Sequence, residues 1–102
     1  MKVVEPVQTI KLFLVYLENN MPVTGLIDLT VTGLDRLGNV ILDETALGEK
    51  ISPDGEYFYM WNVNNSNLLD KFVNIYYKKG SEILDIEEFY FQLLEDMDGV
   101  AS

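Results

Sequence analysis

The 102-residue chain contains no cysteine and no histidine. Without cysteine it has no disulfide, no thiolate metal site and no cysteine nucleophile, and thiol usage gives no information on its redox compartment. Without histidine it lacks the commonest general base, the usual zinc ligand and the base of Ser-His and Cys-His pairs. These absences exclude most hydrolase mechanisms. We therefore expect a non-enzymatic protein without catalytic residues, cofactor or metal site.

Basic residues are also scarce, with seven Lys and Arg against 17 Asp and Glu and a net charge of -10. This charge repels phosphate backbones, so we expect no nucleic-acid binding, and it favours solubility or contact with a basic protein surface. No apolar run reaches the roughly 18 residues of a membrane span. The first 13 residues lack the continuous apolar core and cleavage site of a signal peptide. We expect neither a membrane span nor export.

Hydrophobic patterning in the first half predicts strands. Residues 8–18 form an apolar run that we interpret as one strand, buried on both faces for much of its length. Ile27, Leu29 and Val31 then alternate with polar residues and are expected on one face of a second strand. A loop at 35–39 predicts an antiparallel hairpin with 40–42. Residues 43–50 are expected to cross irregularly to the other sheet, with a short strand near residue 51 and a β-turn at 52–55.

The second half continues the all-β pattern. We predict a strand over 56–63, a polar loop at 64–67 and a strand over 71–77. Residues 83–94 fit a strand better than a helix, although some of their apolar residues have helical spacing. We therefore expect residues 1–94 to form a single β-sandwich domain of about seven strands, and residues 95–102 to form an acidic, mobile tail.

Four rings crowd the strand over 56–63 and form the candidate site. Alternation places Tyr57, Tyr59 and Trp61 on one face and Phe58 and Met60 on the other. Rings facing inward leave Phe58 and Met60 as an exposed apolar pair for a protein partner. Rings facing outward form a ladder that can stack on sugar or grip a peptide. Alternatively, one face is core and the other is covered by the chain itself. We predict partner contact by these five residues.

Carboxylates recur as Asp43-Glu44, Glu87-Glu88 and the run over 95–99. Glycoside hydrolysis uses two carboxylates across a cleft, but the spacing along this chain does not place any two around a substrate. The run over 96–99 lacks the full ligand series of a calcium loop. We interpret all three groups as solvated surface.

Three turn motifs follow one another within residues 10–91. They are PVTGL at 22–26, LGNV at 37–40 and GEY at 55–57. In this order, between apolar strands, they resemble the small immunoglobulin-like β-sandwich modules of tailed-phage and other viral structural proteins. The resemblance implies an immunoglobulin-like antiparallel β-sandwich. It also implies a virion location, after synthesis in the host cytoplasm, and no catalytic residues. The acidic charge and the doubled aromatic faces at 57–61 depart from the pattern.

These observations lead to three functional hypotheses. The first is a non-enzymatic virion structural or assembly protein, in head decoration, neck, tail or fibre, that contacts copies of itself or a larger shell or tail protein. The second is a carbohydrate-binding module that uses the ring ladder. The third is an acidic adaptor or inhibitor that covers a basic protein surface.

Overall fold

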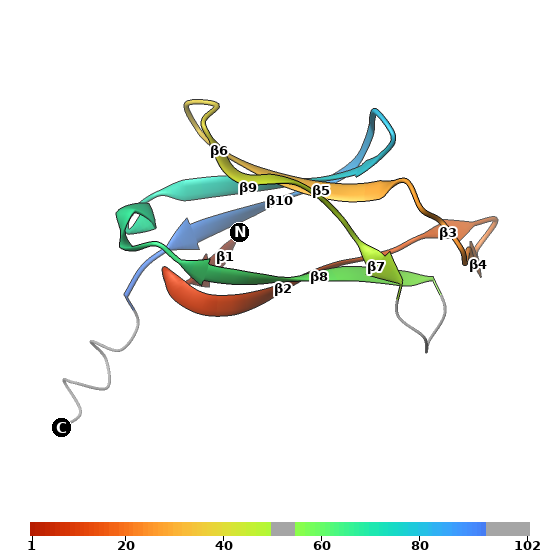
Figure 1. Cartoon of the computed structure of the whole chain (residues 1–102), viewed down its shortest axis with the longest axis horizontal. Coiled ribbons are helices and arrows are strands. Elements are labelled where there is room, and N and C mark those ends of the chain that lie inside the picture. Colours follow the sequence, from red (N-terminus) through yellow and green to blue (C-terminus); the bar gives the residue numbers. More distant parts are fainter. Residues whose placement is uncertain (50–54, 94–102) are drawn as a thin grey trace, which may run out of the picture.

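The computed structural model describes residues 1–49 and 55–93, which form two facing β-sheets (Figure 1). Six strands in this part of the chain have seven to ten residues and four have two or three. In chain order the elements are β1 (Lys2–Val4), β2 (Val7–Val15), β3 (Leu17–Glu18), β4 (Met21–Pro22), β5 (Leu29–Asp35), β6 (Val40–Ala46), β7 (Gly48–Glu49), β8 (Glu56–Asn64), the 3-10 turn η1 (Ser66–Leu68), β9 (Phe72–Lys79) and β10 (Glu82–Phe91).

The strands form a five-stranded sheet in the order β1-β10-β9-β5-β6 and a three-stranded sheet in the order β2-β8-β7, with β3 and β4 in a separate small hairpin. Neighbours pair antiparallel except β1 and β10, which run parallel. The all-β prediction is confirmed. The described residues contain no helix long and apolar enough to cross a membrane.

The core lies between the two sheets because each long strand points alternate residues inward. On β9 these are Val73, Ile75 and Tyr77, which are almost completely buried. Across the sandwich, Trp61 of β8 meets Phe91 of β10 edge to face, with ring centroids 6.1 Å apart. Burial of an apolar side chain of this size contributes about 1.5 to 3 kcal/mol, so such contacts hold the two layers together.

The interpretation of residues 8–18 as one doubly buried strand is wrong. The strand ends at Val15, and on it Ile10 and Leu12 are buried whereas Lys11 and Phe13 are exposed. Within the described residues only one sheet faces β2, and the side chains on its other face are exposed.

Three further expectations need correction. Ile27 is 94% exposed and precedes the strand, which begins at Leu29. The segment after residue 42 continues as β6 to Ala46 and then crosses to the other sheet as β7. The predicted crossing is therefore confirmed, but the segment before it is a regular strand and not an irregular one. The loop at 64–67 contains the turn η1. The predicted strand near 51, most of the turn at 52–55 and the tail over 95–102 lie outside the described residues.

Strand β10 is confirmed, and its geometry explains the helical spacing in its sequence. The register with β9 shifts between Ile83 and Asp85, as a β-bulge does. Ile83 lies opposite Lys78 and Ile86 opposite Tyr76, so the bulge puts both isoleucines on the same outer face at a spacing of three.

Candidate partner-contact face

The two faces of β8 differ in exposure, as the alternation predicted. Tyr57 and Trp61 are buried, with exposures of 0% and 7%, and Tyr59 is partly buried against the core. Phe58 and Met60 point outward, and Met60 is 48% exposed. Tyr57 and Trp61 are therefore buried in the single chain, and partner contact by the five residues stays a prediction. The ladder considered for sugar stacking faces the core.

Tyr57 acts as an internal anchor for the turn at 22–26. Its hydroxyl donates to the carbonyl of Val23 at 2.7 Å and accepts from the amide of Leu26 at 3.3 Å. A phenol buried in a core needs such partners, because an unsatisfied polar group costs about 1 to 3 kcal/mol. This ring therefore fixes the segment that leads into β5.

The outer surface of β2 and β8 forms a continuous face, which we call the aromatic face. Nine consecutive residue pairs join the two strands without a shift in register. Phe13 lies opposite Phe58, Lys11 opposite Met60, and Val15 opposite Glu56. Phe13 is 45% and Val15 50% exposed. The ten positions on this side of the two strands are Val7, Thr9, Lys11, Phe13, Val15, Glu56, Phe58, Met60, Asn62 and Asn64. Glu56 is the one buried residue among them.

Lys11 lies at the centre of this face. Its Nζ is 5.1 Å from the centroid of the Phe13 ring and 5.5 Å from that of Phe58, and it pairs with Glu56 Oε1 at 3.4 Å. A cation over an aromatic face at an exposed site contributes about 0.5 to 1 kcal/mol. These contacts hold the two rings and the ion pair in one arrangement.

The aromatic face has no net charge, because Lys11 and Glu56 are its only charged residues among the ten positions. Half of those positions are apolar, in a chain whose net charge is -10. Interface centres are similarly depleted in charge and enriched in aromatic residues and Met. The net charge of this face thus differs from that of the whole chain, whereas its share of apolar residues is similar.

A polar network closes the sandwich beside β2. The hydroxyl of Tyr77 donates to Glu87 Oε1 at 2.8 Å, and Lys2 Nζ contacts Glu87 Oε2 at 2.8 Å. Burial raises the pKa of Tyr77 well above its ordinary value of 10.0, and the hydrogen bond and charge of Glu87 raise it further. A backbone hydrogen bond from Phe13 acts in the opposite direction. The phenol therefore links β9, β10 and β2.

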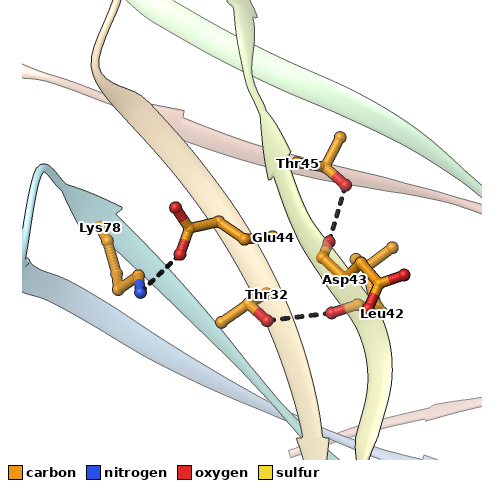
Figure 2. Close-up of polar contacts among 6 residues, drawn as sticks. All are labelled: Thr32, Leu42, Asp43, Glu44, Thr45 and Lys78. Atoms are coloured by element: carbon orange, nitrogen blue, oxygen red, sulfur yellow. Dashed lines mark hydrogen bonds and ion pairs between the residues drawn. The ribbon is translucent and has the colours of Figure 1, made fainter.

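The predicted carboxylate groups lie in ion pairs on the five-stranded sheet. Glu44 Oε1 is 2.8 Å from Lys78 Nζ (Figure 2), and Glu88 Oε2 is 3.1 Å from Arg36. Glu87 belongs to the network above. The described residues hold no cluster of three acidic side chains placed to bind a metal. The run over 95–99 lies outside them.

Lys11, Phe13 and Val15 are functional candidates that the sequence reasoning missed. Their neighbours Ile10 and Leu12 made the whole run look buried. The signal that could have found them is Lys11 itself, because a lysine in the middle of an apolar strand indicates a face open to water.

The chain matches no protein-family model, and no curated protein or solved structure is detectably similar to it.

Proposed function

We propose that this protein is a non-enzymatic structural or assembly subunit that works through protein-protein contacts, and that its aromatic face packs against a second copy of the chain. The observation that carries the proposal is the neutral, half-apolar outer surface of β2 and β8. It exposes Phe13, Val15 and Met60 side by side on a regular sheet.

Charge restricts where a second copy can bind. Two chains of net charge -10 repel each other over most of their surfaces. At the aromatic face the Lys11–Glu56 pair cancels, so two copies can approach there without opposing carboxylates. Burying exposed apolar area on both sides then provides the driving force, at about 25 cal/mol per Å².

The strand order supports an immunoglobulin-like interpretation of the sandwich. The sequence β10-β9-β5-β6 corresponds to the G-F-C-C′ sheet of such domains, and β2-β8-β7 corresponds to B-E-D. Many cell-surface and assembly domains with this architecture act by binding other proteins, which agrees with the proposal at the level of analogy. The virion setting implied by the turn motifs stays a prediction, without support from the comparisons.

The test is the mass of the protein in solution, measured by size exclusion with light scattering across a tenfold dilution. We expect a mass above the 11.7 kDa of one chain. Met60→Glu places a carboxylate within the aromatic face and should lower that mass at equal concentration. The matched control is Val40→Glu, at an exposed apolar position on β6 in the other sheet, which should leave the mass unchanged.

Two results would overturn the proposal. One is a mass of one chain at every concentration. The other is a Met60→Glu variant whose mass equals that of the parent protein and of Val40→Glu.

A further inference from the structure

Among the strands of residues 1–49 and 55–93, none pairs with the outer side of β2, which is an open edge of the three-stranded sheet. It is nine residues long and pairs with β8 without a bulge. A long, regular edge strand presents a row of unpaired amides and carbonyls to any second strand, and natural proteins usually block such edges.

The direction of its backbone groups follows from the two ends of the ladder. The carbonyl of Pro6 accepts from the amide of Asn65 at 3.0 Å, and the amide of Tyr16 donates to the carbonyl of Gly55 at 2.8 Å. The backbone amides and carbonyls of the even-numbered residues of β2 are therefore directed toward β8. Because bonding alternates in antiparallel pairs, the odd-numbered residues 7 to 15 direct their amides and carbonyls to the open edge.

In the other sheet β6 is a long edge, and the part of β10 before Phe89 extends beyond the edge strand β1. Both carry blocking devices. On β10 a bulge follows Ile83, and the side chain of Asp85 accepts from the amide of Ile86 at 2.9 Å. On β6 the register with β5 shifts twice. There, the hydroxyl of Thr45 occupies the carbonyl of Asp43 on β6 itself, and the hydroxyl of Thr32 on the neighbouring strand β5 binds the carbonyl of Leu42 (Figure 2).

The remaining edges are short, since β1 has three residues and β7 has two. Among the strands that the structure describes, β2 is therefore the one long edge without a bulge. Its single charge is the positive Lys11, whereas β10 and β6 carry carboxylates. For a chain of net charge -10 it is the edge at which two copies meet with least repulsion.

We propose that β2 pairs antiparallel with β2 of a second copy, centred on Leu12, to form one continuous sheet across two chains. This inference rests on the proposed assembly function and names its second contact. A pair centred on Lys11 would place two lysines opposite each other, which destabilises a ladder. Centring on Leu12 places Lys11 opposite Phe13 and Thr9 opposite Val15. Lys11 already contacts an aromatic ring within its own chain, so the new neighbour suits it.

Pairing changes one existing bond. The amide of Phe13, bound to the Tyr77 phenol in the single chain, exchanges that partner for the Lys11 carbonyl of the second copy. The two aromatic faces then lie side by side on one surface, where they remain free to pack against another pair.

The register is tested by disulfide trapping, which is clean because the chain has no cysteine of its own. Thr9→Cys and Val15→Cys chains are prepared separately, mixed under mild oxidation and separated without reductant. Opposed residues in a hydrogen-bonded antiparallel pair have Cα atoms about 5.5 Å apart, within disulfide range. Like residues in this register lie about 20 Å apart. We expect the mixture to yield several times more disulfide dimer than either variant alone.

A second measurement uses Thr9→Pro, which removes an amide that faces the open edge and which an edge strand tolerates. Its matched control is Thr9→Ala, which loses the hydroxyl bonded to Asn62 but keeps the amide. By light scattering, Thr9→Pro should have a lower mass than Thr9→Ala. Near-ultraviolet circular dichroism of buried Trp61 checks folding, and disulfide trapping remains decisive where the proline variant fails to fold.

The outcomes separate the two proposals. If the mixture gives no more dimer than the single variants, or if folded Thr9→Pro keeps the mass of Thr9→Ala, edge pairing is wrong. If Met60→Glu still lowers the mass in that case, the face contact stands alone. If the mixture gives more disulfide dimer and Met60→Glu leaves the mass unchanged, edge pairing is supported and packing through the aromatic face is wrong. A single-chain mass in every sample overturns both.

Discussion

At the scale of single residues, Gly55 shows how a turn residue controls the fold around it. It has a φ of +86°, and a Cβ added there would lie 2.7 Å from the Cβ of Pro22. Its carbonyl also binds the amide of Tyr16, which ties the start of β8 to the end of β2. Glycine is therefore required for two reasons, the left-handed backbone and the close approach of another segment.

We predict that Gly55→Ala destabilises the protein more than Gly38→Ala does. Gly38 also has a positive φ, of +89°, but has open space around its Cα. Backbone strain alone should cost Gly38→Ala about 1 to 2 kcal/mol, and the contact with Pro22 adds to that cost at Gly55. Urea unfolding of both variants measures the difference. Equal losses would show that the packing against Pro22 is unimportant.

A second residue-scale prediction concerns Tyr77 and high pH. Its folded pKa is raised above the unfolded value of 10.0, first by burial and then by Glu87. The unfolded chain therefore releases this proton more readily, so the stability is fully present below pH 10 and is lost as the pH rises above it. The slope contributed by one proton is at most about 1.4 kcal/mol per pH unit.

The measurement compares urea unfolding of the parent and of Tyr77→Phe between pH 8 and about 11. We expect Tyr77→Phe to be less stable at pH 8 by about 1 kcal/mol, because it loses the bond to Glu87. Its stability should fall less steeply above pH 10. If the unfolding free energies of the two proteins fall equally with pH, the Tyr77 phenol does not cause the loss of stability above pH 10.

At the scale of elements, the two faces of β8 lie in different surroundings. Trp61 packs on Phe91 of the opposite sheet, whereas its neighbour Met60 lies on the aromatic face. Of these two adjacent residues, one packs in the core and the other is, under our proposal, a contact residue.

We predict that Trp61→Ala costs about 3 to 5 kcal/mol of folding stability, whereas Met60→Ala, on the surface, costs about 0.5 kcal/mol. Unfolding followed by far-ultraviolet circular dichroism at low protein concentration compares both with the parent protein. A large loss at Met60 in the dissociated chain would mean that this face is part of the fold rather than a contact surface.

At the scale of the whole molecule, charge is distributed unevenly. Five of the seven basic side chains are held in ion pairs with acidic side chains of the described residues, and the aromatic face holds one such pair. The ion pairs are Lys2–Glu87, Lys11–Glu56, Arg36–Glu88, Lys78–Glu44 and Lys79–Asp28. The excess negative charge therefore lies on other surfaces and opposes association of two copies.

Self-association should accordingly strengthen as salt rises. The Debye length falls from about 10 Å at 0.1 M to about 3 Å at 1 M, so salt screens the repulsion between the two anionic chains while apolar contact persists. Sedimentation equilibrium over this salt range measures the association constant. Dissociation at high salt would instead indicate contact between opposite charges, as an acidic adaptor would make.

The sequence by itself determined the all-β class, the hairpin around Gly38, the two-faced alternation of residues 57 to 63 and the absence of thiol and imidazole chemistry. Each of these depends on neighbouring residues, through turn chemistry and a period of two. Only the tertiary structure decided which face of β8 is buried, that β2 is open on one face and along one edge, and that Ile83 and Ile86 share a face through a bulge. These features depend on which sheet packs on a strand and which strand pairs with it. A largely apolar run such as 10–15 has the same composition whether one face of its strand is covered or both are.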